Sequence, residues 1–118
     1  MKKGKISELE FSERFTYLKN IPFDSVALRA KGTKFQVVIF LPNKSIGPHY
    51  HKKTCEIFFI YSGEGKIALN NRWNMCRRGD FFLCEPGDMH EFTNTGKENL
   101  VVLIFKTNEK EKDIFWKK

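Results

Sequence analysis

Short apolar segments divided by turn residues constrain the fold of this chain more than any other feature. The segments are rich in β-branched and aromatic side chains, turn-forming residues lie between them, and no long stretch keeps a helical period. We therefore expect short strands over residues 26–30, 35–41, 49–51, 56–61, 66–69, 73–77, 81–84, 90–92 and 100–106. Many short strands at this spacing predict an all-β sandwich or barrel.

Two pieces of sequence are typical of tight turns. Ser62-Gly63-Glu64-Gly65 and Asn70-Asn71 supply glycine and asparagine, which tolerate the positive φ that tight hairpins demand. We expect a hairpin turn at each.

The size of the chain favours one domain. It has 118 residues, of which 41% are hydrophobic, including twelve phenylalanines, enough for a single core. We expect one domain over residues 1–118, with an N-terminal extension at 1–20, a barrel at 21–107 and a charged C-terminal tail at 108–118. We expect residues 6–15 to form a strand or helix outside the barrel or against a second subunit. Phe115-Trp116 is expected either to cover an apolar edge or to belong to a frayed tail.

The cellular location is read from what the chain lacks and from its cysteines. No apolar run is long enough to span a membrane, and the charged residues 1–8 lead into mixed polar sequence, unlike a signal peptide. Cys55, Cys76 and Cys84 are odd in number and lack CxxC spacing, which favours free structural thiols in a reducing compartment. We expect a cytoplasmic protein with no membrane partner.

The net charge of +7 is dispersed along the chain. No segment forms a basic helix or a stripe of basic and aromatic residues, so we expect no nucleic-acid partner. Two basic pairs, Lys52-Lys53 and Arg77-Arg78, are either solvated turn residues or a rim that attracts an anionic small molecule.

All three histidines fall in one pattern that suits a metal ion. His49 and His51 are two residues apart, so in a strand they point to the same face. One neighbouring strand with Glu56 and another with His90 would complete the ligand set. The sequence thus predicts one divalent transition metal ion, and this ligand set does not choose among Mn, Fe, Co, Ni, Cu and Zn.

The same residues resemble the two motifs of the cupin superfamily. The first motif is similar to His49-Tyr50-His51, Glu56 and Gly63, and the second to Gly79-Asp80, Glu85-Pro86-Gly87, His90 and Asn94. The segment between the motifs, residues 64–78, has the length typical of compact microbial members. Two turn positions depart from the pattern, since Asn43 stands where a glycine is usual and Pro86 lies one place late. The resemblance implies a double-stranded β-helix, the jelly-roll barrel of cupins, and a homodimer paired through an outer strand.

Strand alternation predicts the lining of the cavity. If Glu56 and His90 point inward, so do Phe58, Ile60 and Phe92. Residues expected to point outward are Tyr50, Tyr61 and Glu91. No histidine is left over to act as a general base, so the catalytic residues stay unassigned. Four further residues are candidates for proton transfer, but the sequence does not decide whether their side chains face the cavity. They are Arg29, Gln36, Cys84 and Glu85.

Three functions remain open, each with a small-molecule ligand or substrate, anionic ones included. In the first function, the metal acts as a Lewis acid on a sugar or other small hydroxy or carbonyl compound, as in an isomerase or epimerase. Alternatively, iron or copper holds substrate and oxygen in a dioxygenase. The third function is a non-catalytic ligand-binding or sensor module, because a fold does not decide a function.

Overall fold

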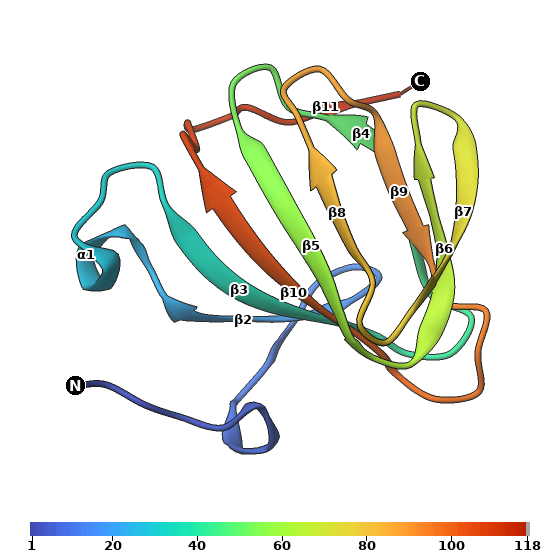
Figure 1. Ribbon diagram of the computed structural model, residues 1–118, viewed down its shortest axis with the longest axis horizontal. Helices are drawn as coiled ribbons and strands as arrows, with labels where there is room; N and C mark the ends of the chain where they lie inside the picture. Colours follow the sequence, from blue (N-terminus) through green and yellow to red (C-terminus); the bar gives the residue numbers. More distant parts are fainter. Residues whose placement is uncertain (118) are drawn as a thin grey trace.

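Two antiparallel sheets face each other in the computed structural model, which describes residues 1–117 (Figure 1). The six strands of the first sheet are, in spatial order, β1 (Ser12–Glu13), β2 (Leu18–Phe23), β3 (Lys34–Phe40), β10 (Leu100–Thr107), β5 (Cys55–Ser62) and β8 (Phe81–Cys84). The five strands of the second sheet are β11 (Phe115–Trp116), β4 (Ser45–Tyr50), β9 (His90–Thr93), β6 (Glu64–Leu69) and β7 (Arg72–Arg77). A short 3-10 helix, Ile6–Glu8, precedes β1.

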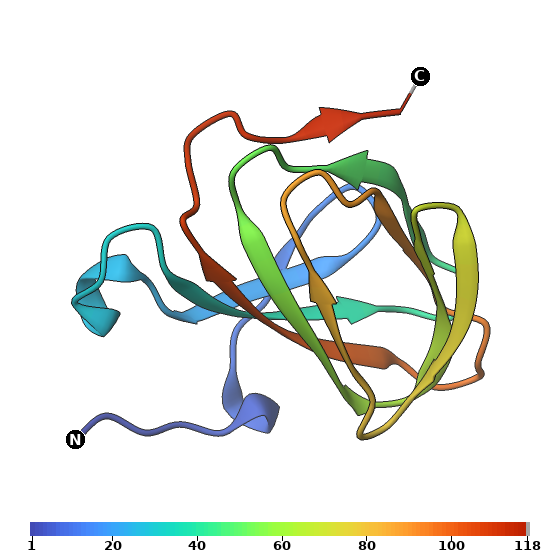
Figure 2. The same cartoon turned by 45° about the horizontal axis from the view of Figure 1, so that its top comes forward.

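The chain crosses repeatedly from one sheet to the other. β3, β5, β8 and β10 lie in the first sheet, whereas β4, β6, β7 and β9 lie in the second. The strands curl into the barrel seen in Figures 1 and 2, and the expected all-β jelly roll is confirmed. No helix within residues 1–117 is both long and apolar enough to cross a membrane.

Period-two alternation places the core between the sheets. Along β5, Glu56, Phe58 and Ile60 are buried, whereas the residues between them face outward. Phe92 joins the two sheets, because its ring meets Phe40 at 5.7 Å and Phe58 at 5.0 Å between centroids. Removing such a buried aromatic ring costs about 3–5 kcal/mol.

The strand expected at residues 26–30 is wrong, because Ser25–Leu28 form the short helix α1. The carboxylate of Asp24 caps this helix by accepting a hydrogen bond from the backbone N–H of Ala27 at 2.9 Å. Arg29 then ends the helix in the left-handed conformation, with φ of 54°. Val26 is 82% exposed, so its apolar side chain marks no core position here.

Of the two expected hairpin turns, one is confirmed and one is wrong. Asn70 and Asn71 join the paired strands β6 and β7 and adopt φ of 51° and 66°. Gly63 instead connects β5 to β6, which lie in different sheets. Its φ is 82°, and a Cβ at this position would collide with the carbonyl oxygen of Asn99.

The C-terminal segment, residues 108–117, closes over one end of the barrel (Figure 2). Its strand β11 pairs with β4, with Phe115 opposite Tyr50 and Trp116 opposite His49. Lys118, the last residue of the expected tail, lies outside the described residues.

Candidate metal centre

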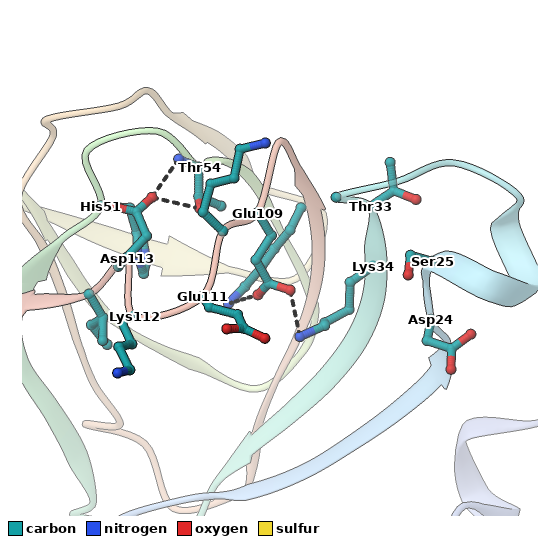
Figure 3. A pocket seen from close by; sticks show the side chains of 14 residues that line it. Asp24, Ser25, Thr33, Lys34, His51, Thr54, Glu109, Glu111, Lys112 and Asp113 are labelled. Atoms are coloured by element: carbon teal, nitrogen blue, oxygen red, sulfur yellow. Dashed lines mark hydrogen bonds and ion pairs between the residues drawn. The ribbon is translucent and has the colours of Figure 1, made fainter.

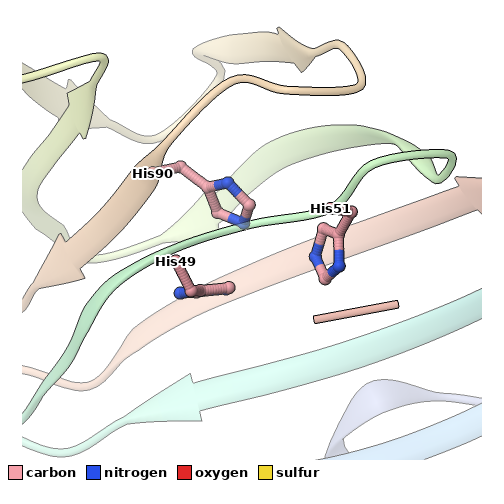
Figure 4. Close-up of side chains that lie close together, drawn as sticks. All are labelled: His49, His51 and His90. Carbon is pink, nitrogen blue, oxygen red and sulfur yellow. The ribbon is translucent and has the colours of Figure 1, made fainter. Parts of the chain in front are cut away.

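The three histidines meet in the barrel interior near the end covered by the C-terminal segment (Figure 4). His49 lies in β4 opposite His90 at the start of β9, and His51 follows the last residue of β4. All three are buried, and one nitrogen from each ring lies within 4.8 Å of the others. Three chain positions thus bring three imidazole nitrogens to one point.

Backbone carbonyls fix how each ring is presented. Nδ1 of His49 lies 2.8 Å from the carbonyl oxygen of Gly47, and Nδ1 of His90 lies 3.2 Å from that of Asp88. Nδ1 of His51 meets the carbonyl oxygen of Asp113. A carbonyl only accepts, so we assign the proton of each neutral ring to Nδ1. Each Nε2 then keeps a free lone pair, as a metal ligand requires.

The carboxylate of Glu56 enters the same space from β5. Its Oε1 lies 2.8 Å from Nε2 of His51 and 3.3 Å from Nε2 of His90. Two ligands at right angles on an ion with bonds of about 2.1 Å also lie about 3 Å apart. Within residues 1–117, Oε1 has no polar partner besides these two ring nitrogens.

Electrostatics favour a neutral His49 and a charged Glu56. Burial lowers the pKa of His49 to about 4, and the neighbouring His90 contributes, so the His49 ring is neutral at pH 7. Burial would raise the pKa of Glu56, but His51, His90 and Lys106 outweigh it and hold that pKa below its usual range. For His51, burial is outweighed by hydrogen bonding to Glu56 and Asp113, which raises the pKa. The carboxylate is therefore charged and orients His51.

These residues fit a divalent transition metal ion. Three imidazole nitrogens form a donor set that such ions accept, and the Glu56 carboxylate, which lies outside this group of three, contacts two of its rings. The His49, His51 and His90 group can therefore hold an ion.

A small cavity of about 80 Å³ opens beside the histidines. Phe58 and Phe92, two of the residues expected to line it, do so, whereas Ile60 is fully buried in the core and does not reach the lining. Tyr61, expected to point outward, is 46% exposed. The outward residues Tyr50 and Glu91 are partly buried, Tyr50 by stacking on Phe115.

The sequence left open whether four further residues face the cavity, and the structure places one of them in its lining. Gln36 lines the cavity from β3. Cys84 lies behind the site, with its sulfur 3.1 Å from Nδ1 of His90, and burial raises its pKa well above the usual range. Arg29 and Glu85 are exposed and do not line the cavity.

Sequence reasoning missed several cavity residues. Lys19 comes from β2 and Tyr17 from just before it, Lys106 comes from β10, and Ile114 comes from the C-terminal segment. Alternation could have found Lys106, since it follows Leu100, Val102 and Ile104 at every second place along an expected strand. The other three lie where no strand was expected.

A wider groove of about 560 Å³ leads away from the site (Figure 3). Charged side chains line it, and Glu109 pairs there with Lys34 at 2.7 Å and with Lys106 at 3.5 Å. His51 and Lys106 border both spaces, so the groove adjoins the metal cavity. The expected rim residues Lys52 and Lys53 are exposed and line neither space.

Comparison with known proteins agrees with the fold. An oxalate-binding protein of Thermotoga maritima is 31% identical over 77 residues, which are 65% of this chain and 64% of that protein. The chain thus spans less than two thirds of the curated relatives it matches first. A Thermotoga maritima structure described as a predicted oxalate decarboxylase superposes with a TM-score of 0.80 at 24% identity, covering 88% of this chain and 96% of that one.

A second solved structure has a different description. It comes from Acidithiobacillus ferrooxidans and is described as a proposed sugar phosphate isomerase. It superposes with a TM-score of 0.78 at 20% identity and covers 94% of this chain and 76% of that one. The model of the cupin domain matches residues 36–106, more than half of the chain. The chain belongs to the cupin family.

Proposed function

We propose that this chain binds one divalent transition metal ion through His49, His51, His90 and Glu56 and presents it to a small anionic or sugar-like ligand. The observation that carries the proposal is the group of three buried imidazole nitrogens within 4.8 Å of one another, with the Glu56 carboxylate against two of the rings. Within the described chain, Nε2 of His51 and Nε2 of His90 are the polar partners of Oε1 of that carboxylate. A cation is the partner that all four groups share.

Metal chemistry of the Lewis-acid type is the reaction class that this site supports best. A six-coordinate ion with four protein ligands keeps two positions open, which suits two adjacent oxygens of one small molecule. All three histidines serve as ligands, so none is free as a general base. An isomerase or epimerase that polarises a hydroxy or carbonyl compound fits these constraints, as does the description of the Acidithiobacillus relative.

A binding module without turnover is the second candidate. It is favoured by the name of the Thermotoga relative, which describes binding of oxalate. An iron- or copper-dependent dioxygenase would instead consume oxygen together with its substrate. Turnover of a ligand and oxygen uptake by the metal-loaded protein therefore separate the three functions.

The decisive experiment is metal analysis of protein produced without a histidine-rich tag. We expect close to one metal ion per chain, and its loss in His51→Ala, because that change removes one of the converging nitrogens. A protein that takes up no Mn, Fe, Co, Ni, Cu or Zn, or a His51→Ala variant that holds its ion with unchanged affinity, would contradict the proposal.

The same proposal includes a homodimer of single-domain chains in a reducing compartment such as the cytoplasm. Free Cys55, Cys76 and Cys84 support that compartment. The outer face of β8, β5 and β10 supports the dimer, because exposed apolar residues adjoin across its strands. We call this surface the β8 face. It consists of Ile57, Phe59, Phe81, Leu83 and Phe105. A second copy that packs on this face would remove it from water.

A further inference from the structure

The side-chain oxygen of Gln36 is buried in the cavity without a hydrogen-bond partner among the described residues. The residue is 4% exposed, its side chain lines the cavity, and its Oε1 accepts no hydrogen bond from any described residue. An unpaired buried acceptor costs about 1–3 kcal/mol. A ligand that donates a proton to this amide and accepts one from it would remove that cost.

Two lysines line the same cavity. Lys106 lies on the inner face of β10, two residues beyond Ile104, which pairs with Gln36. Lys19 of β2 is paired with Val38, two residues beyond Gln36 on β3. Since cross-strand partners share a face, the amide and both ammonium groups belong to one patch of the inner sheet surface.

Positive charge is in excess around this patch. Lys106 lies 3.9 Å from Glu56 and 3.5 Å from Glu109, and Glu109 also pairs with Lys34. Lys19 forms no ion pair within residues 1–117. Burial, helped by repulsion from Lys106 and Lys34, lowers the pKa of Lys19 to about 8. A bound divalent ion would add to the excess, so an anion is the ligand that this end of the cavity favours.

Building on the metal site proposed above, we propose that Lys19, Gln36 and Lys106 form a carboxylate-binding end of the cavity that takes a short hydroxy acid or a half-protonated dicarboxylic acid. The carboxylate accepts from the lysines and from the Gln36 amide N–H, while a hydroxyl of the ligand donates to Gln36 Oε1. The remaining oxygens face the ion. A cavity of about 80 Å³ limits the ligand to a few non-hydrogen atoms.

The test measures binding of glycolate and oxalate to metal-loaded protein by calorimetry, with neutral glycolamide as the uncharged analogue of glycolate. Lys19→Met removes the ammonium at similar length, and Gln36→Leu removes the amide without changing the charge. We expect each variant to keep its metal and to bind glycolate about tenfold or more weakly than the wild type. Lys66→Met, on the exposed face of β6, is the matched control and should bind as the wild type does.

Three results would overturn the inference. Metal-loaded wild type that binds neither acid, or that binds glycolamide as tightly as glycolate, excludes a carboxylate site. Wild-type glycolate affinity in metal-loaded Gln36→Leu and Lys19→Met excludes these residues while leaving the metal site intact. If Lys19→Met loses its ion, Gln36→Leu alone decides. A wild type without metal overturns the proposed function and this inference together.

Discussion

Asp113 holds His51 from the far end of the chain. The backbone carbonyl of Asp113 meets Nδ1 of His51, while its carboxylate accepts hydrogen bonds from the backbone N–H groups of Lys52, Lys53 and Thr54 at 2.8–3.0 Å. The hydroxyl of Thr54 donates to the same carboxylate at 3.0 Å. The C-terminal segment is therefore fixed to the turn that follows His51, and it sets the orientation of one ring of the three-histidine group.

Replacing the carboxylate of Asp113 should weaken metal binding although Asp113 is not itself a ligand. In Asp113→Ala the turn and the C-terminal segment lose four hydrogen bonds, so the carbonyl no longer holds His51 in place. We expect a loss of about tenfold in affinity for Zn²⁺, with folding preserved. Competition with a chelator measures it. Glu111→Ala, on the same exposed segment, is the control, and equal affinities in both variants would contradict the prediction.

Trp116 should report metal binding directly. Its ring lies 4.7 Å from that of His49 between centroids, whereas Trp73 is an exposed residue of β7 outside the cavity lining. Binding of Cu²⁺ should therefore quench the fluorescence of Trp116. In a titration, Trp73→Phe should keep this quenching and Trp116→Phe should lose it. The reverse result would place the ion elsewhere.

The sequence predicted those parts of the fold that depend on alternation. The inward positions of His49, Phe58 and His90 follow from the alternation along β4, β5 and β9, because successive side chains of a strand point to opposite faces. The helix α1 was missed because Val26 has strand propensity but is solvated. There the cap at Asp24 decides the local structure over apolar composition.

The inward position of Lys19 in the cavity could not be predicted from a single sequence. Lys19 faces inward only because β2 adds to the edge of β3, and that pairing joins segments with no local signal for each other. The role of residues 108–117 likewise arises from contacts with β4 some sixty residues earlier, such as the separation of 62 between His51 and Asp113. Long-range contacts of this kind have no periodic pattern in the sequence.

Charging the β8 face should dissociate the homodimer. Phe81 is 75% exposed on the edge strand β8 and is paired with Phe59, so it lies within the apolar face. In Phe81→Glu a second copy would bury a carboxylate against phenylalanine rings, which is unfavourable. Sedimentation at micromolar concentration should show a dimer for the wild type and a monomer for the variant. Val26→Glu, equally exposed on α1, should stay dimeric, and a monomeric wild type would refute the dimer itself.

Asp113 should also make stability depend on pH in acid. Burial opposes ionisation, but the four hydrogen bonds together outweigh it and lower the pKa from 3.8 to about 2. A carboxyl whose pKa is depressed by folding stabilises the native state above its unfolded pKa. That contribution is lost as the pH falls from about 3.8 to about 2. Urea unfolding of the metal-free wild type should lose stability over this window, and Asp113→Asn should lose less.

Gly63 should tolerate no side chain. Its φ of 82° favours glycine, and a Cβ would meet the backbone of Asn99 and Leu100, which cannot move without shifting β10. We expect Gly63→Ala to lower the free energy of unfolding by about 2 kcal/mol or more. Gly47→Ala is the matched control, because a Cβ there meets no described atom within 4 Å, and it should change stability by about 0.5 kcal/mol or less. Urea denaturation of the two variants compares them, and equal stabilities would show that the crossover from β5 to β6 adopts another conformation.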